Sequence, residues 1–336
     1  MESFWNKLLK PIMILAPMAD VTDAAFRRII AKYGKPDVMY TEFVSADGLC
    51  HPEGRKKLLI DLKYTEAERP IVAQLFTANP AKMREAATLA QELGFDGLDI
   101  NMGCPDRTVE KQGCGAALMK NPKLSRELIR AAKEGASRLP ISVKTRIGYN
   151  KNELETWLPE LLAEEPAAVT IHARTRKEMS KVPARWEHVR EAVALRDRLD
   201  SETLILGNGD VSDIADAKKK AEESSADGVM LGRAIFGNPW LFADSPRLNL
   251  GSTERFDLSH LEPAGKEKLL VMLEHTKLFE ELFAGRKNFA IMKKHYKAYV
   301  EGFDGAKELR IKLMEAENFR EVERSVHEFL KTPDKI

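Results

Sequence analysis

The chain has 336 residues, of which 43% are hydrophobic, so it can bury one large core or a core with a smaller second domain. Its 53 lysines and arginines nearly balance its 52 aspartates and glutamates, which excludes binding to nucleic acid through net charge but leaves room for local basic patches. The 3 cysteines lack zinc spacing and are too few for a disulfide framework, so we expect a reducing compartment and a cytoplasmic protein. The apolar stretch at the amino terminus is too short for a signal peptide or a membrane span, so we expect neither.

Short runs rich in isoleucine, valine and leucine recur along the first two thirds of the chain, and charged amphipathic stretches separate most of them. Apolar strands that alternate with helices are typical of a parallel sheet covered on both faces. Eight strands favour a (β/α)8 TIM barrel over an open doubly wound sheet. The predicted strands are 12–17, 38–44, 71–76, 97–101, 141–146, 168–173, 203–208 and 228–232, and the amphipathic stretches are 80–94, 121–137, 152–165, 185–199 and 211–225.

The pattern changes near residue 246, where a segment rich in proline, glycine and serine begins. Beyond it the apolar periodicity is helical over 265–284, 287–300, 305–315 and 318–331. We therefore predict a catalytic barrel over 1–245, a linker over 246–263 and a small all-helical domain over 264–336.

An open dinucleotide-binding sheet is the main alternative fold, because GCGAAL at 113–118 is similar to the GxGxxG fingerprint. That segment lacks the third glycine, and it begins about a dozen residues after its strand instead of immediately after it. The first predicted strand ends in Ala-Pro-Met without a glycine-rich turn. These features favour the barrel.

Polar residues follow every predicted strand at its carboxyl end, which in this kind of barrel faces the active site. Glycine-containing loops after the seventh and eighth strands, NGD at 208–210 and GR at 232–233, are suited to hold a phosphate on backbone N–H groups, although each glycine alone could be an ordinary turn. The polar residues are Asp20, Glu42, Gln74, Asn101, Cys104, Lys144, Arg146, His172, Arg174, Arg176, Asn208, Asp210 and Arg233.

Lys144 and Gln74 indicate what a phosphate site would hold. Lys144 lies within a predicted strand and points into the barrel mouth, where an ammonium needs an anion. A cation there suits the negative charge of a reduced flavin, and Gln74 can hydrogen-bond the polar edge of the ring. A Schiff-base lysine or an internal ion pair are the alternatives.

Seven segments together resemble the motifs of tRNA-dihydrouridine synthases, in the order of that family: APMADVTDAAFR (16–27), QLFTANP (74–80), DINMGCPDRTVEKQGCGAAL (99–118), SVKTRIGY (142–149), IHARTR (171–176), GNGD (207–210) and GVMLGRAIFGNPWLF (228–242). The resemblance implies a flavin enzyme in which NADPH reduces FMN, flavin N5 gives hydride to uracil C6, and Cys104 gives a proton to C5. It also implies the flavin contacts Pro17, Met18, Gln74, Lys144, His172, Asn208, Gly209, Asp210, Gly232 and Arg233.

The chemistry of Cys104 supports the role of proton donor. Hydride addition at C6 leaves negative charge at C5, which needs a proton source, and a thiol of ordinary pKa is mostly protonated at pH 7. A buried structural thiol or a nucleophile activated by His172 or Lys144 are the competing interpretations. We interpret Cys114 as structural. Cys50, beside His51 in the loop after the second strand, lacks further ligands for a metal site, and no metal is expected.

A tRNA substrate needs a basic surface, and the segment 286–300 has five lysines and arginines and no acid. At helical spacing Arg286, Lys293 and Lys297 share one stripe with Lys287 and Lys294 beside it. The apolar seam consists of Phe289, Met292, Tyr296 and Tyr299. A solvated surface is the alternative. We assign Asn101, Arg174, Arg176, Arg286, Lys293, Lys294 and Lys297 to the substrate, although Arg174 and Arg176 could instead hold the flavin phosphate.

Three functions therefore stand against one another: a flavin-dependent reductase of tRNA, which we favour; a related enzyme acting on a free pyrimidine; and a tRNA-binding protein without catalysis. The basic segment 286–300 has no evident purpose in an enzyme that acts on a free pyrimidine. Cys104 and Lys144 have no evident purpose in a binding protein without catalysis. We expect a monomer without a protein partner. Which uridine is reduced does not follow from the chemistry at the flavin.

Overall fold

The computed structural model describes residues 3–243 and 263–331, so the predicted linker lies, except for Pro263, outside the described residues. The chain divides into two compact units. The barrel unit comprises Met1–Ala19 and Pro36–Arg233, and the helical unit comprises Asp20–Lys35 and Ala234–Ile336. Each unit has its own architecture.

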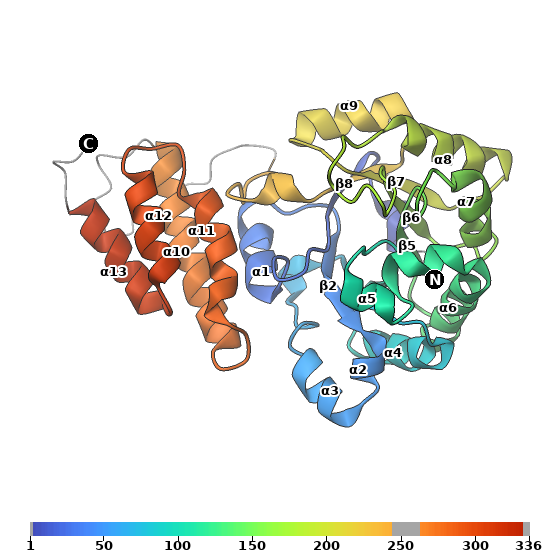
Figure 1. Ribbon diagram of the computed structural model, residues 1–336, viewed down its shortest axis with the longest axis horizontal. Coiled ribbons are helices and arrows are strands. Elements are labelled where there is room, and N and C mark those ends of the chain that lie inside the picture. The colour runs from blue at the N-terminus through green and yellow to red at the C-terminus, as the bar shows by residue number, and fades with distance from the viewer. Residues whose placement is uncertain (1–2, 244–262, 332–336) are drawn as a thin grey trace. The chain divides into compact units, whose positions relative to one another are not determined.

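The barrel unit is built on a parallel sheet of eight strands in the order β1-β8-β7-β6-β5-β4-β3-β2 (Figure 1). A parallel bridge between Ile14 and Val38 joins β1 to the segment before β2, so the sheet returns on itself as a (β/α)8 barrel. The predicted fold class is confirmed. The strands are β1 (Ile12–Leu15), β2 (Met39–Ser45), β3 (Ile71–Phe76), β4 (Gly97–Asn101), β5 (Ile141–Arg146), β6 (Ala168–His172), β7 (Leu204–Asn208) and β8 (Gly228–Leu231).

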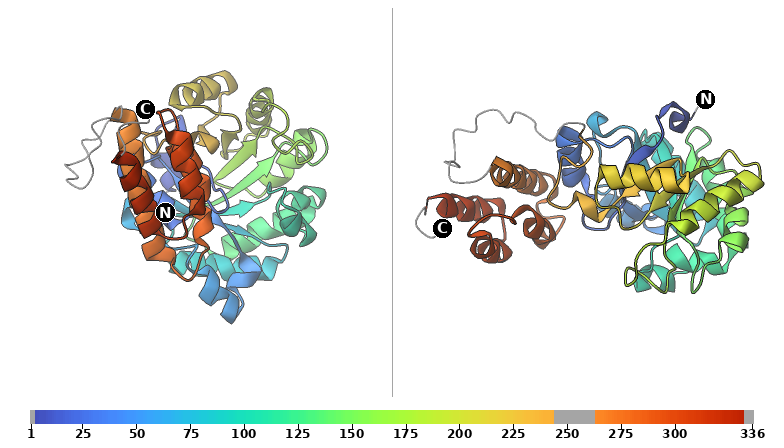
Figure 2. Two further views of the ribbon diagram at one scale, coloured as in Figure 1. Left: turned by 60° about the vertical axis from the view of Figure 1, so that its left-hand side comes forward. Right: turned by 90° about the horizontal axis from the view of Figure 1, so that it is seen from above.

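Helices connect successive strands on the outside of the barrel (Figure 2). Several start where the sequence supplies a cap: Asn79 and Asn121 accept backbone N–H groups immediately before a proline at the first helical position. The five predicted stretches are confirmed as α4 (Pro80–Glu92), α6 (Pro122–Gly135), α7 (Leu154–Leu162), α8 (Glu187–Arg198) and α9 (Ile214–Ser224). Shorter elements are η1 (Phe4–Lys7), α2 (Ala46–Leu49), α3 (Pro52–Leu58), η2 (Glu66–Glu68), α5 (Arg107–Lys111), η3 (Gly115–Lys120) and η4 (Arg233–Ile235).

One prediction about a loop is corrected, and one rejected alternative is excluded. Cys50 does not lie in an open loop, because α2 and α3 flank it and its Sγ donates to the carbonyl of Lys82 at 3.5 Å. Most of the GCGAAL segment lies in the 3-10 helix η3, which begins at Gly115, so it is not the strand-to-helix phosphate turn of a dinucleotide-binding sheet.

The inward-facing side chains of the barrel change character along the strands. Near the amino ends they form an apolar cluster with Trp5, which includes Ile12, Val72, Leu206 and Met230. Side chains point inward at every second residue, so the same rows continue into polar residues at the carboxyl ends. The interior is therefore packed at its base and polar at its mouth.

The helical unit contains α1 (Ala24–Tyr33), α10 (Pro263–Phe283), η5 (Phe289–Met292), α11 (Lys293–Tyr299), α12 (Ala306–Glu315) and α13 (Phe319–Leu330). Although α1 follows the first barrel strand in sequence, it packs on α10, where Lys32 and the hydroxyl of Tyr33 both contact Glu274, at 2.7 Å and 2.5 Å. Three residues of the predicted apolar seam, Met292, Tyr296 and Tyr299, are buried, and the fourth, Phe289, is partly buried.

The prediction of one continuous helix over 287–300 is wrong. Gly285, with a positive φ of 70°, follows the end of α10, and the Asn288 side chain caps η5 before α11 begins. Arg286 therefore lies in a turn and cannot share a helical stripe with Lys293 and Lys297. Within the described residues, no helix is both long and apolar enough to cross a membrane.

Candidate active site

The mouth of the barrel brings together polar side chains from the carboxyl-terminal halves of five strands. Gln74 comes from β3, Asn101 from β4, Lys144 from β5, His172 from β6 and Asn208 from β7. Hydrogen bonds join neighbours across the ring: Asn101 Nδ2 donates to Gln74 Oε1 at 3.2 Å, and Lys144 Nζ donates to Asn208 Oδ1 at 3.1 Å. Four of these five side chains therefore form two hydrogen-bonded pairs at this end of the barrel.

Cys104 lies in the loop between β4 and α5, where it is partly exposed. Asn101 Oδ1 accepts the backbone N–H groups of Gly103 at 3.1 Å and Cys104 at 2.9 Å, and Arg146 Nε donates to the Gly103 carbonyl at 2.8 Å. A Cβ at Gly103 would lie 3.1 Å from the backbone of Thr145, so glycine lets this loop rest closely on β5. Burial raises the pKa of the Cys104 thiol, which keeps it protonated at neutral pH.

Two cations of β5 face this loop without carboxylate partners. Burial lowers the pKa of Lys144 to about 8 and that of Arg146 to about 10. The guanidinium of Arg146 donates to carbonyls only, those of Gly103, Thr175 and Met179. In the described parts of the chain neither cation forms an ion pair, so no carboxylate neutralises their charge by direct contact.

A chain of contacts continues from β6 to β8. Arg174, which is 3% exposed, pairs with Asp210 and lies 3.2 Å from His172 Nε2. Asp210 also accepts Arg233 Nη2 at 2.5 Å. Burial and the surrounding cations lower the pKa of His172 well below its ordinary value, so its imidazole is neutral.

The two glycines of the predicted phosphate loops differ in their surroundings. Gly209 has a φ of 123°, and a Cβ there would lie 2.8 Å from Ala184 and 3.1 Å from the ring of His172. A Cβ at Gly232 would meet nothing nearer than Met18 Sδ at 3.5 Å. Gly209 is therefore required by the backbone, whereas a Cβ at Gly232 would make only ordinary contacts with Met18 and Ala16.

Arg176 has a different environment from Arg174. Its guanidinium makes a bidentate pair with Glu110 of α5, with Nε at 2.8 Å from Oε1, and it lies 5.2 Å from the ring of Tyr149. Lys120 covers the same ring, with Nζ at 3.7 Å from the centroid. Both predicted arginines of this loop are thus engaged with carboxylates of the protein.

The four predicted basic residues of the tail lie in the helical unit. Arg286, Lys294 and Lys297 are exposed, and Lys293 is partly buried. Lys294 Nζ lies 3.1 Å from Asp20 Oδ2, so one of the four charges is partly compensated.

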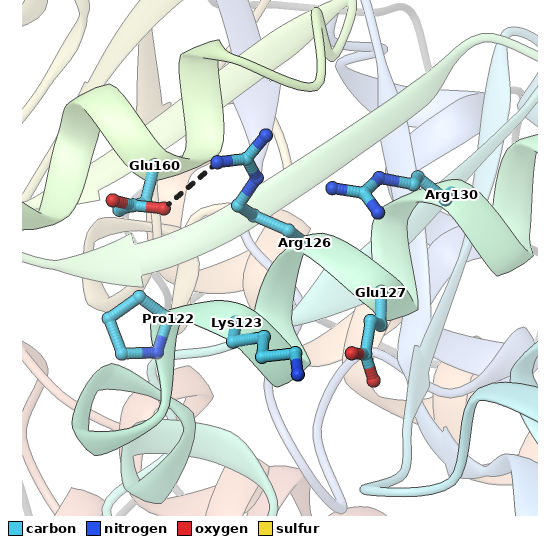
Figure 3. Close-up of a pocket in the computed structure, with 6 residues that line it drawn as sticks. All are labelled: Pro122, Lys123, Arg126, Glu127, Arg130 and Glu160. Atoms are coloured by element: carbon cyan, nitrogen blue, oxygen red, sulfur yellow. Dashed lines mark hydrogen bonds and ion pairs between the residues drawn. The ribbon is translucent and has the colours of Figure 1, made fainter.

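Two hollows on the barrel unit lie away from the mouth. One, of about 360 Å³, adjoins α6 and α7, and Figure 3 shows Arg126 directed at Glu160 there, with Lys123, Glu127 and Arg130 nearby. Arg126 and Arg130 also bind Glu164, so acids cancel the bases. The other, of about 630 Å³, lies at the barrel base beside Lys10, Arg196 and Asp227. Neither has the uncompensated charge of the mouth.

One residue of the mouth, Asp99, was missing from the predicted polar residues, and Arg146 was among them without an assigned role. Asp99 is fully buried and accepts from Gln74 Nε2 at 2.7 Å, and Arg146 holds the Cys104 loop. The signal was present in the strand alternation, because Asp99 and Asn101 share one face of β4, and Lys144 and Arg146 share one face of β5.

A (β/α)8 barrel that concentrates buried cations and a protonated thiol at its carboxyl-end mouth defines a barrel enzyme. A family model described as dihydrouridine synthase matches residues 14–333, and the chain belongs to this family. It is accordingly an oxidoreductase, and the resemblance seen in the sequence motifs is confirmed.

Individual relatives agree with this assignment. The chain is 45% identical over 261 residues to the probable tRNA-dihydrouridine synthase 2 of Bacillus subtilis (strain 168), covering 77% of this chain and 79% of that protein. It is 43% identical over 261 residues to the probable tRNA-dihydrouridine synthase of Staphylococcus aureus (strain COL), with the same coverage. Among solved structures, morphinone reductase in complex with tetrahydroNAD is similar, with 15% identity and a TM-score of 0.48 over 72% of this chain and 89% of that chain.

Proposed function

We propose that this protein reduces the C5–C6 double bond of uridines in tRNA to give 5,6-dihydrouridine, with FMN bound in the barrel mouth and NADPH as the reductant of the flavin. The observation that carries the proposal is the placement of Cys104, a thiol kept protonated by burial, beside the uncompensated cations Lys144 and Arg146. Family membership supplies the reaction class. Because the substrate is tRNA, we place the reaction in the cytoplasm.

The residues of the mouth fit FMN. Lys144 has Asn208 as its hydrogen-bond partner and keeps further N–H donors for an anion. The space beside Gly232, next to Met18, can admit a group that approaches the backbone closely. Arg233, with its side chain 67% exposed, can contact a phosphate while Asp210 orients it. Gln74, His172, Asn208, Gly209 and Pro17 complete the proposed flavin contacts.

FMN, when bound, supplies the hydride for C6 of the uracil ring. Cys104 supplies the proton for C5, and its raised pKa ensures that the thiol holds that proton at neutral pH. The backbone of Cys104 is fixed by Asn101 and its neighbour Gly103 by Arg146, so the thiol has a defined position on a short loop. The cations Lys144 and Arg146 stabilise negative charge that develops on the uracil oxygens.

The proposed role of the helical unit is to hold the rest of the tRNA through phosphate contacts. Lys294 and Lys297 are exposed on α11, and Arg286 is exposed in the turn before η5. Lys293 is partly buried, and its ammonium group can still contact a phosphate while its aliphatic stem packs against the protein. Uridines in folded tRNA are stacked or paired, so the target nucleotide must be extruded to reach a mouth residue such as Cys104. We propose that the protein acts as a monomer.

Replacement of Cys104 tests the chemical step. We expect Cys104→Ala to keep the yellow flavin spectrum and tRNA affinity but to lose turnover by about 10²-fold or more, the range that general acids contribute. Cys114→Ala, which removes a buried thiol ten residues later in the same connection, is the matched control and should retain turnover. Dihydrouridine formed in unmodified tRNA is the measurement. Equal turnover in both variants would remove Cys104 from the mechanism.

Replacement of the basic residues tests the substrate. We expect Lys293, Lys294 and Lys297 changed together to Ala to weaken tRNA binding and to flatten its salt dependence. Changing Lys307, Lys312 and Lys331 to Ala removes three charges from α12 and the end of α13 in the same unit, and should change the affinity and its salt slope much less. A colourless protein that cannot be reconstituted with FMN, or turnover of free uracil with indifference to tRNA, would refute the proposed function.

A further inference from the structure

Asp99 is a fully buried carboxylate in the interior of the barrel. It lies on β4 directly between Gln74 of β3 and Ser142 of β5, which are its register partners in the neighbouring strands. Ser142 Oγ donates to one carboxylate oxygen at 2.6 Å, and Gln74 Nε2 donates to the other at 2.7 Å. Both oxygens of Asp99 therefore accept from a neighbouring strand.

This carboxylate has no ion-pair partner among the residues that the structure describes. Lys144 is close enough to favour the charged form of Asp99, but the ammonium donates its hydrogen bond to Asn208. Burial raises the pKa of Asp99 to about 6 despite the bonds from Ser142 and Gln74, so the group is ionised at neutral pH. A buried unpaired charge is costly, and an amide or hydroxyl would fill the same place at lower cost.

The hydrogen bonds that begin at Asp99 run in one direction to the loop of Cys104. Because a carboxylate only accepts, the Gln74 amide turns its nitrogen toward Asp99 and its oxygen toward Asn101. Asn101 then turns its nitrogen toward Gln74, which leaves its oxygen to accept the backbone N–H groups of Gly103 and Cys104. Backbone N–H groups only donate. The carboxylate at one end of this series of hydrogen bonds and the N–H groups at the other therefore require the same orientation of the two amides.

We propose that Asp99 is a positioning residue for the proton donor: through Gln74 and Asn101, its carboxylate fixes the orientation of two amides and thereby the position of the Cys104 loop. The inference rests on the proposed function, in which Cys104 protonates the substrate. A carboxylate suits this task because it offers acceptors to both neighbours. Asparagine offers one acceptor and one donor, which permits either orientation of the Gln74 amide.

Asp99→Leu removes the acceptor that orients Gln74 while keeping a side chain of similar size. We expect kcat to fall roughly ten- to a hundredfold, because a small displacement of a reacting group has effects of this order. KM for tRNA should change little, since the helical unit holds most of the tRNA. The assays use protein with full flavin occupancy, checked by absorbance.

Two variants control for a merely structural role. Asp99→Asn keeps one acceptor and allows both amide orientations, so its kcat should lie between those of the wild type and Asp99→Leu. Ser142→Ala removes the other hydrogen bond of Asp99 without touching Gln74, and we expect a kcat within about twofold of the wild type. Equal losses in Ser142→Ala and Asp99→Leu would indicate general damage to the barrel and overturn the proposal.

The rate of alkylation by iodoacetamide, mapped by peptide mass spectrometry, reports the loop position without any turnover. In Asp99→Leu we expect alkylation of Cys104 to become several-fold faster, with Cys50 and Cys114 unchanged as internal references. An unchanged rate at Cys104 together with an unchanged kcat would refute the role of Asp99, even if Cys104→Ala is inactive. Full turnover in Cys104→Ala would refute the proposed function instead, while the alkylation rates would still test the positioning of the loop.

Discussion

The two ends of the barrel bury charge in opposite ways. At the base, Asp227 accepts Lys10 at 2.5 Å and Arg196 at 2.9 Å, and these bonds hold its pKa below the ordinary value although burial alone would raise it. At the mouth, Lys144 and Arg146 have amide and carbonyl partners only, and burial lowers their pKa values. The charges at the base are therefore paired within the protein, whereas the cations at the mouth are arranged for a negatively charged ligand.

Removal of one lysine from each end should give the largest contrast. We expect Lys144→Met to lower kcat/KM for tRNA about 10²-fold, because a fixed positive charge at the reacting group is lost. The free energy of unfolding should not fall, since an apolar side chain of similar length replaces a partly buried charge without a carboxylate partner. Steady-state kinetics and urea unfolding measure the two quantities.

Lys10→Met is the matched control at the base. Lys10 has a side chain 55% exposed, and Asp227 keeps Arg196 when it is removed. We expect unchanged kcat/KM and at most a small loss of stability. If Lys10→Met impaired turnover as strongly as Lys144→Met, the distinction between the two ends would be untenable.

Asp227→Asn should show the second largest effect, and on stability instead of activity. Its carboxylate also accepts the backbone N–H of Ile205, so neutralising it leaves Lys10 without its anion and Arg196 with Asp197 alone. We expect a loss of about 2 kcal/mol in the free energy of unfolding. Turnover by the folded fraction should match the wild type, and a specific loss of kcat would show that the base contributes to the site.

The sequence predicted those features of the two barrel ends that produce a local pattern of residues. The strands were predicted to within about two residues because apolar runs and intervening amphipathic stretches are local patterns. The ring of Gln74, Asn101, Lys144, His172 and Asn208 followed from strand ends, since a barrel places all carboxyl ends at one rim. The partners of each side chain did not follow, because they depend on register between strands distant in sequence.

Three features show where local pattern fails. Asp99 was missed because a single acid inside an apolar strand gives no periodic signal, although its inward position can be derived once the strand is known. Arg286 was assigned to a helical stripe from the spacing of the basic residues alone, whereas the turn at Gly285 that separates it from the helix is a property of the backbone. The first helix, α1, belongs to the helical unit through Tyr33 and Glu274, a pairing between residues more than two hundred positions apart.

Two glycines at opposite ends of β8 allow a finer test. A Cβ at Gly232 would meet no atom nearer than 3.5 Å, so Gly232→Ala should fold with nearly wild-type stability but bind FMN about tenfold more weakly, because the methyl group occupies space needed by the proposed phosphate. Binding to the apoprotein, followed by flavin fluorescence, measures this. Unchanged affinity would argue that the phosphate does not approach the backbone there.

Gly228→Ala should have the opposite profile. A Cβ at Gly228 would lie 2.6 Å from the carbonyl oxygen of Ile12 on the neighbouring strand, so the substitution forces β1 and β8 apart at the base. We expect a lower melting temperature, and an affinity for FMN in the folded protein close to that of the wild type. A tenfold loss of FMN affinity with no change in melting temperature would contradict the division of roles along this strand.

The smallest expected effect is a difference in alkaline stability between the two ends. The pKa of Lys144 is about 8 in the folded protein and about 10.4 in an unfolded chain. Between these values the unfolded state holds a proton that the folded state has released, so this group makes the free energy of unfolding rise with pH. Because the side chain is only partly buried, we expect the wild type to gain about 1 kcal/mol over Lys144→Met between pH 8 and 10. The difference between the wild type and Asp227→Asn should stay flat over the same range, because this carboxylate, whose pKa is lowered, is ionised in both states. If the two stability differences depended on pH in the same way, the charge of Lys144 would be as fully compensated within the protein as the charges at the base.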